Sequence, residues 1–245
     1  GKSTLMKIII GLEKQDSGEI LFEGKPYKAS NPAEAISKGI TMIHQELNPE
    51  PYLTVAENIF LNNEDTRGII LNKKKTIAKA RKLLEEFNFK VSPTHMVEGL
   101  TLAQAQVIEI IKAVSRDAKL VIMDEPTSSL DSEETEQLFE IIRKLKRDGV
   151  SVIYISHRME EIFGICDQVS VFRDGRFIDC LPVADVTPQM LINKMVGREI
   201  SNVFPKVDCP IGDVALRVEN LCGNGFQNIS FEVHKGEILG FTGLA

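Results

Sequence analysis

The stretch Leu-Val-Ile-Met-Asp-Glu at 120–125 constrains the fold of this chain more than any other feature. A short, continuous apolar run is typical of a strand that is buried on both faces of a parallel sheet. Apolar runs of the same kind lie at 40–43 and 150–155, and residues at helical spacing separate the three runs. The helical pattern is carried by Val107, Ile110, Ile111 and Val114, and then by Leu138, Ile141, Ile142 and Leu145. Strands that alternate with helices predict an α/β fold with an open, mostly parallel sheet.

Residues 46–119 carry mostly helical patterns between two of the predicted strands, which indicates a helical subdomain inserted into the sheet. One helix is predicted over 73–88. Its apolar face is formed by Ile77, Ala80, Leu84 and Phe87. A β-hairpin is predicted at 168–181, because Asp174-Gly175 lies between two strand-like segments. The hairpin adds a small antiparallel part to the predicted fold.

Composition and charge narrow the class of protein. The 245 residues are 43% hydrophobic and 26% charged, which is ordinary for a globular protein. The formal net charge of -6 implies no basic face large enough for non-specific binding to a nucleic-acid duplex. No apolar run approaches the roughly 18–20 residues of a membrane-spanning helix, and residues 1–11 do not resemble a signal peptide. The four cysteines contain no C-x-x-C pair, so we expect reduced thiols.

The chain opens with Gly1-Lys2-Ser3-Thr4 directly before an apolar helical run that ends at Gly11. These four residues match the second half of a phosphate-binding loop. In such a loop, glycine lets backbone N–H groups surround phosphate oxygens, Lys2 reaches the β- and γ-phosphates, and Ser3 holds Mg²⁺. The alternative is an ordinary capped helix start.

Asp124 and Glu125 follow the predicted central strand, where the carboxyl edge of a parallel sheet binds ligands. Asp124 is expected to hold Mg²⁺, and Glu125 to polarise a water that attacks a γ-phosphate. The alternative is an acidic strand end that caps the next helix.

Further motifs make the chain resemble an ABC-type ATPase. Asp-Glu-Pro-Thr-Ser-Ser-Leu-Asp at 124–131 is similar to a Walker B motif with its D-loop, and His-Gln-Glu-Leu at 44–47 to a Q-loop. Ile-Ser-His at 155–157 is similar to the switch-histidine loop, and Leu-Thr-Leu-Ala-Gln at 100–104 occupies the place of the signature motif. Their order and spacing match the family across 1–200. The resemblance implies the P-loop NTPase fold of the ABC type, with ATP and Mg²⁺ as ligands.

The resemblance also implies roles for individual residues. Gln45 would contact Mg²⁺ and the attacking water, and His157 would contact the γ-phosphate. Gly1, Lys2, Ser3 and Thr4 would bind ATP. Thr101, Gln104 and Asp131 would contact an ATP that is held by a partner domain. Leu102 and Ala103 stand where the family usually has two glycines, which hinders close approach of the backbone to that ATP.

Three other segments, 54–61, 159–163 and 195–198, resemble the monosaccharide importers of this family. The implied function is ATP hydrolysis that drives import of a sugar similar to galactose or methyl-galactoside, or of ribose or xylose. The implied partners are a homodimeric membrane permease, a periplasmic or extracellular sugar-binding protein and a second nucleotide-binding domain, with no nucleic acid. The expected location is peripheral, at the cytoplasmic face of the cell membrane.

The same family places two nucleotide-binding domains in one polypeptide. We therefore expect residues 1–204 to be a first domain that lacks its N-terminal part, and 205–213 to be a linker. Residues 214–245 would be the opening strands of a truncated second domain, at 214–219, 229–233 and a buried 237–242. The last of these strands would either fill a place in the first domain's sheet, with Ala245 near Gly1, or project away from it.

Two other functions stay open. A soluble ABC-type ATPase of translation or DNA repair is expected to carry basic or coiled-coil insertions, and none is visible. A catalytically incomplete fragment is the other alternative, because only the second half of the phosphate loop is present.

Overall fold

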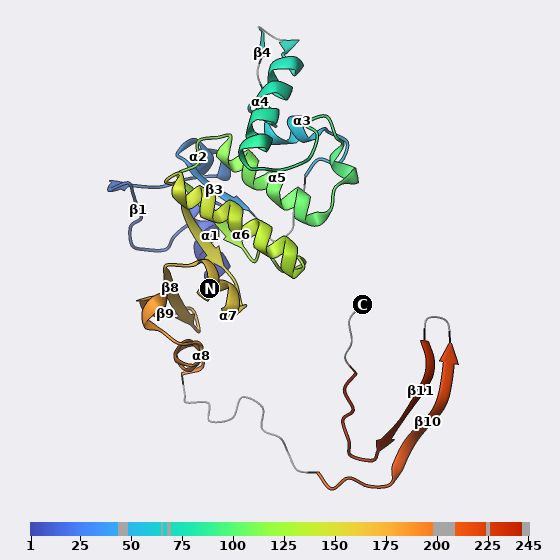
Figure 1. Ribbon diagram of the computed structural model, residues 1–245. Coiled ribbons are helices and arrows are strands. Elements are labelled where there is room, and N and C mark those ends of the chain that lie inside the picture. The colour runs from blue at the N-terminus through green and yellow to red at the C-terminus, as the bar shows by residue number, and fades with distance from the viewer. Residues whose placement is uncertain (44–48, 65, 68–69, 198–208, 224–225, 242–245) are drawn as a thin grey trace. The chain divides into compact units, whose positions relative to one another are not determined.

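The computed structural model describes residues 1–43, 49–64, 66–67, 70–197, 209–223 and 226–241 (Figure 1). The chain divides into two compact units, Gly1–Arg198 and Glu199–Ala245. The described residues contain no helix with the length and apolar character needed to cross a membrane.

A three-stranded parallel sheet forms the centre of the first unit. Its strands are β3 (Ile40–Ile43), β6 (Leu120–Asp124) and β7 (Ser151–Ile155), in the order β3-β6-β7. The register pairs Asp124 at the end of β6 with Ile155 at the end of β7. The parallel sheet predicted from the three apolar runs is therefore confirmed, and the segments that follow β6 and β7 start from neighbouring points of one sheet edge.

Helices cover both faces of this sheet (Figure 1). They are α1 (Lys2–Ile9), α2 (Pro32–Ser37), α5 (Leu102–Val114) and α6 (Ser132–Arg147). Successive residues of a strand point to opposite faces. Val121 and Met123 pack with α5 and α6 in one apolar cluster, and Ile122 packs with Met6 of α1 and Ala35 of α2 in another. This alternation explains why an uninterrupted apolar run at 120–123 is needed in a central strand.

Burial of β7 differs from the prediction. The apolar run at 150–155 predicts a strand buried on all sides, but Val152, Ile153 and Tyr154 are only half-buried. The reason is that β7 is the last strand of the sheet among the described residues, with β6 as its only ladder partner there. An apolar sequence run reports which faces are covered and not whether the strand lies at an edge.

The inserted helical part contains α3 (Val55–Ile59), α4 (Lys73–Glu86), a 3-10 turn η1 (Val97–Gly99) and α5. The helix predicted over 73–88 is found as α4, with its Ala80 and Leu84 buried. A short antiparallel pair, β4 (Thr66–Arg67) and β5 (Ile70–Leu71), was not predicted. Two-residue strands are too short to give a period-2 pattern in the sequence.

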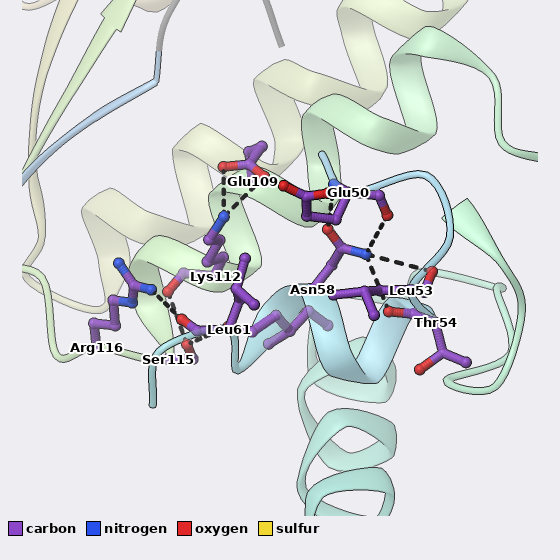
Figure 2. A network of polar contacts seen from close by, with 10 residues as sticks. Glu50, Leu53, Thr54, Asn58, Leu61, Glu109, Lys112, Ser115 and Arg116 are labelled. Atoms are coloured by element: carbon purple, nitrogen blue, oxygen red, sulfur yellow. Dashed lines mark hydrogen bonds and ion pairs between the residues drawn. The ribbon is translucent and has the colours of Figure 1, made fainter. Parts of the chain in front are cut away.

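The side chain of Asn58 in α3 forms hydrogen bonds with the backbone of residues 50–54, which lead into this helical part (Figure 2). Its side chain is fully buried. The Asn58 amide nitrogen donates to the Glu50 carbonyl at 3.0 Å and to the Thr54 carbonyl at 3.2 Å, and its oxygen accepts from the Glu50 N–H at 2.9 Å. One side-chain amide therefore forms hydrogen bonds with several backbone N–H and carbonyl groups of residues 50–54.

We expect Asn58→Ala to destabilise the first unit by about 2–3 kcal/mol, because it removes several hydrogen bonds between a fully buried side-chain amide and the backbone of Glu50, Leu53 and Thr54. Urea denaturation measures the change in the free energy of unfolding. Asn63→Ala is the matched control, since Asn63 is exposed. Equal effects of the two substitutions would show that the buried network adds no stability.

The remaining elements of the first unit are short. They are β1 (Leu21–Phe22), β2 (Lys25–Pro26), α7 (Met159–Ile165), β8 (Gln168–Arg173), β9 (Arg176–Pro182), a 3-10 turn η2 (Val183–Asp185) and α8 (Pro188–Val196). Strands β8 and β9 form the predicted hairpin. Its turn has φ of +50° at Asp174 and +76° at Gly175, as a two-residue Asp-Gly turn requires.

The second unit is a hairpin of β10 (Val214–Gly223) and β11 (Phe226–His234). The strands predicted at 214–219 and 229–233 are both found, and both are longer than predicted. The buried strand predicted at 237–242 is wrong for 237–241, which form no strand and leave Ile238 99% exposed. Among the described residues, 237–241 pair with neither β10 nor β11. Residues 242–245, on which a position of Ala245 near Gly1 depends, lie outside the described residues.

Candidate functional site

The N-terminus of α1 presents backbone N–H groups to solvent. Gly1 is the N-cap and has no side chain with which to cap them. Lys2, Ser3 and Thr4 are all exposed, while Met6 is buried in the core and anchors the helix. A helix start with uncapped N–H groups, a positive dipole end and a lysine suits an anion such as phosphate.

Glu125 turns the chain sharply at the end of β6. Its φ of +49° lies in the left-handed region, which is uncommon for a residue with a long side chain. The Glu125 N–H donates to the Ile155 carbonyl at 2.9 Å, so the end of β7 holds this conformation in place. Such backbone strain costs on the order of 1–3 kcal/mol and is concentrated at functional sites.

Glu125 and His157 meet at the carboxyl edge of the sheet. His157 Nδ1 lies 3.2 Å from Glu125 Oε1. Glu125 is half-buried, whereas His157 is exposed. Asp124, which precedes Glu125, is also half-buried and pairs with Ile155 in the sheet register. The structure thus brings together three predicted site residues that come from two different strand ends.

A cavity of about 820 Å³ lies along β7. Most of its lining is apolar and comes from α1, β7, α7 and β8. Lys2, Ser156 and His157 are among the polar groups that line it. Lys2 and His157 therefore face one shared space, although they are 155 positions apart in the sequence.

Three further predicted residues line a different cavity of about 320 Å³: Thr101, Gln104 and Asp131. This cavity shares no lining residue with the first one. The predicted site residues therefore fall into two groups, one around Glu125 and His157 and one around the starts of α5 and α6.

The residues of the second group also cap helices. Thr101 Oγ1 accepts from the Gln104 N–H at 3.2 Å, and Gln104 Oε1 accepts from the Thr101 N–H at 3.1 Å. Asp131 Oδ1 accepts from the Glu134 N–H at 2.8 Å. These capping boxes hold the helix starts. Among the described residues, the Thr101 hydroxyl donates no hydrogen bond, so its hydrogen can bind a further acceptor.

Leu102 and Ala103 are the first two residues of α5, and Leu102 is 48% exposed beside Thr101. Gln45 and the rest of the 44–47 motif lie outside the described residues.

Sequence reasoning did not assign a role to Glu161 of α7. Its carboxylate is 3% exposed and accepts hydrogen bonds from Thr127 Oγ1 at 2.6 Å, Ser156 Oγ at 2.6 Å and Tyr154 Oη at 3.0 Å. Arg158 forms an ion pair with it at 2.9 Å. The sequence offers only one signal, an acid four residues after His157, and burial of that acid is a property of the tertiary structure.

The pKa of Glu161 gives a pH-dependent contribution to stability. Burial in itself raises the pKa of this carboxyl, but hydrogen bonds from Ser156, Thr127 and Tyr154 outweigh burial and hold the pKa below its ordinary value. Because the folded-state pKa is the lower one, the charged carboxylate stabilises the fold at neutral pH. This stabilisation is lost as the pH falls through the folded-state pKa.

We therefore expect the difference in melting temperature between wild type and Glu161→Gln to be largest above about pH 5 and to shrink below about pH 4. Thermal unfolding at a series of pH values measures it. Glu160→Gln is the matched control, because Glu160 is exposed. A difference that does not change with pH would contradict a stabilising charge on Glu161.

Comparison with known proteins relates this geometry to a family. The chain is 47% identical over 247 residues to a ribose/galactose/methyl galactoside import ATP-binding protein of Geobacillus kaustophilus, covering 100% of this chain and 49% of the relative. It is 48% identical over 246 residues to a protein of the same description from Burkholderia cenocepacia, covering 100% of this chain and 47% of the relative. The chain thus spans about half the length of the curated relatives it matches.

Solved structures show the same fold. An ATP-binding cassette of an ABC transporter in its ADP conformation matches with a TM-score of 0.69 and 25% identity, over 81% of this chain and 84% of that chain. A dimeric cassette in a post-hydrolysis state, bound to ADP and Pi, matches with a TM-score of 0.61 and 24% identity, over 75% of this chain and 81% of that one. These likenesses confirm the predicted P-loop NTPase fold of the ABC type.

The family model described as ABC transporter matches residues 1–128, just over half of the chain. Together with the curated relatives, this match confirms the resemblance drawn from the motifs, and the chain belongs to the ABC transporter family.

Proposed function

We propose that the protein hydrolyses ATP to drive an ABC importer for a monosaccharide. The observation that carries this proposal is the contact between Glu125 and His157 at 3.2 Å, with His157 lining the cavity that Lys2 also lines. A carboxylate in contact with an imidazole, and an ammonium group that lines the same cavity as the imidazole, suit the attack of water on a phosphoanhydride.

Each residue has a defined part in this reaction. Lys2 and the backbone of Gly1 to Thr4 bind the phosphates, because the helix start offers N–H donors and positive potential. Glu125 polarises the attacking water. His157 contacts the γ-phosphate and, together with Glu125, orients the attacking water. Gln45 of the 44–47 motif contacts the same water. The donors and charges act where negative charge develops in the transition state.

The donor chemistry also suits Mg²⁺, which takes few protein oxygens and keeps its remaining ligands as water and phosphate oxygens. Asp124 supplies a half-buried carboxylate and Ser3 an exposed hydroxyl. Gln45 is the third proposed ligand. Among the described residues, no group of three or more His, Cys, Asp or Glu side chains forms a metal site of its own. Mg²⁺ would neutralise charge on the β- and γ-phosphates.

Thr101, Gln104 and Asp131 serve a second nucleotide, which a partner nucleotide-binding domain holds. Their separate cavity supports this division of the site residues into two groups. We propose that residues 1–204 form one such domain and 205–213 a linker. Residues 214–245 would then open the second domain in the same polypeptide, in line with a chain that spans about half of its relatives.

The proposed partners are a homodimeric membrane permease and a periplasmic or extracellular sugar-binding protein, with the ATPase peripheral at the cytoplasmic face. The relatives' description as import ATP-binding proteins supports a partner in the membrane. Galactose, methyl-galactoside and ribose are the candidate sugars that this description names, and xylose is the further candidate from sequence resemblance.

Nucleotide binding tests the proposal directly. In the full-length protein we expect Lys2→Ala to weaken binding of a fluorescent ATP analogue by about 10- to 100-fold, because a charge-assisted contact to phosphate is lost. Lys7→Ala is the matched control, since Lys7 lies on the same helix and pairs with Glu13. Unchanged affinity in Lys2→Ala would reject Lys2 as a phosphate ligand.

A transport assay distinguishes the proposed importer function from a soluble ABC-type ATPase and from a catalytically incomplete protein. Uptake of labelled galactose, methyl-galactoside, ribose and xylose is measured in cells that lack the gene and in cells that carry it again. Restored uptake of one sugar supports the importer. ATP hydrolysis without any sugar uptake favours the soluble ATPase, and absence of both favours a catalytically incomplete protein.

A further inference from the structure

Glu161 connects the two loops that carry Glu125 and His157. Thr127, two residues after Glu125, donates its hydroxyl hydrogen bond to Glu161 Oε1. Ser156, which immediately precedes His157, donates to Glu161 Oε2. A single buried carboxylate therefore accepts one hydrogen bond from each loop.

Both loops are held further by backbone hydrogen bonds that involve the same residues. Ser156 Oγ accepts from the Arg158 N–H at 3.0 Å, so one hydroxyl holds the residues on either side of His157. In the other loop, the Leu130 N–H donates to the Thr127 carbonyl at 3.2 Å and the Ser128 N–H to the Glu125 carbonyl at 3.3 Å. Displacement of the Glu161 carboxylate would remove one hydrogen bond from each loop at once.

We propose that Glu161 is a positioning residue that keeps Glu125 and His157 in contact through Thr127 and Ser156. This inference rests on the proposed ATP hydrolysis. Glu161 itself is buried. Among the described residues, it forms no hydrogen bond or ion pair with Glu125 or His157.

An ionised carboxylate suits this task because it is an acceptor only, and both of its oxygens bind hydroxyl donors. A glutamine at 161 keeps the size but offers one oxygen, so one of the two loops loses its acceptor. Misplacement of a reacting group by about 1 Å can lower the rate about 10²-fold without weakening substrate binding to the same degree.

The experiment measures steady-state ATP hydrolysis by the full-length protein. For Glu161→Gln we expect kcat to fall at least about tenfold, while KM for ATP and the affinity for a fluorescent ATP analogue stay within about twofold of wild type. Glu160→Gln is the matched control, being the adjacent, exposed acid. We expect it to behave as wild type in both measurements.

Tyr154→Phe separates positioning from stability. Tyr154 donates to the same carboxylate, but it lies in β7 and not in either loop. We expect this variant to melt at a lower temperature and to keep kcat within about twofold of wild type. In contrast, Thr127→Val should lower kcat as Glu161→Gln does. Thr127→Ser, which restores the hydroxyl, should return kcat to within about threefold of wild type.

The outcomes distinguish this inference from the proposed function. If wild type hydrolyses ATP and Glu161→Gln and Thr127→Val keep its kcat, the positioning role is wrong and the proposed function stands. If Thr127→Val and Tyr154→Phe lower kcat equally, Glu161 acts only through stability, and the inference is again wrong. If wild type itself does not hydrolyse ATP, both the function and the inference fail. Should Glu161→Gln not fold, Thr127→Val and Thr127→Ser still decide the matter.

Discussion

Substitution of Glu125 by glutamine is expected to leave ATP binding intact and to lower the rate of hydrolysis by about 10²–10⁴-fold, the usual effect of removing a general base. The amide has nearly the size of the carboxylate, so the nucleotide site keeps its shape. The amide of the glutamine does not polarise the attacking water as the carboxylate does, because the amide carries no negative charge. Phosphate release and binding of a fluorescent ATP analogue by the full-length protein measure the two properties separately.

The matched control for this substitution is Glu136→Gln. Glu136 is exposed in α6, lines neither cavity and lies outside the contact with His157. Turnover of Glu125→Gln at the wild-type rate would reject Glu125 as the residue that polarises water. Loss of ATP binding in Glu125→Gln would instead show that the carboxylate is needed to hold the nucleotide site together.

Substitution of His157 by alanine is expected to lower hydrolysis by about 10²-fold, with a much smaller effect on ATP affinity. The imidazole lies 3.2 Å from the Glu125 carboxylate and also lines the cavity shared with Lys2. Its removal takes away both the orientation of Glu125 and a contact to the γ-phosphate. His95→Ala is the control, because His95 is exposed in the helical part and away from these contacts.

When two residues act together in catalysis, the effects of their substitutions on the rate are not additive. The double variant Glu125→Gln with His157→Ala should therefore be little slower than Glu125→Gln alone. A rate that falls by the product of the two single effects would mean that the two side chains act independently, and their contact would have no catalytic importance.

The parallel sheet was predictable because burial on two faces leaves a direct mark on the sequence. Leu120 to Met123 must be apolar at every position when helices cover both faces of the sheet. The edge position of β7 left no such mark, since Val152 to Tyr154 would be apolar in a central strand as well. The segment 237–241 was predicted as a strand on its apolar residues, but an apolar run does not determine strand pairing, and this segment pairs with no strand among the described residues.

The candidate site was predictable residue by residue but not as a network. The motifs around Lys2, Glu125 and His157 combine residue types that phosphate chemistry requires at fixed local spacings, so each could be assigned from a few neighbouring residues. The assignment of Glu161 could not be made in this way. Its partner Thr127 is 34 positions distant in the chain, and an acid in a helix is usually exposed to solvent.

The sequence by itself determined which chemical groups this protein has and the order of the strands and helices that carry them. Only the tertiary structure decided that Glu125 lies against His157 and that Thr101 and Asp131 line a separate cavity. The tertiary structure also decided that the buried carboxylate of Glu161 accepts hydrogen bonds from Thr127 and Ser156. The physical reason is that periodicity and motif spacing arise from neighbours along the chain, whereas distances between strand ends arise from how β6, β7, α5, α6 and α7 pack.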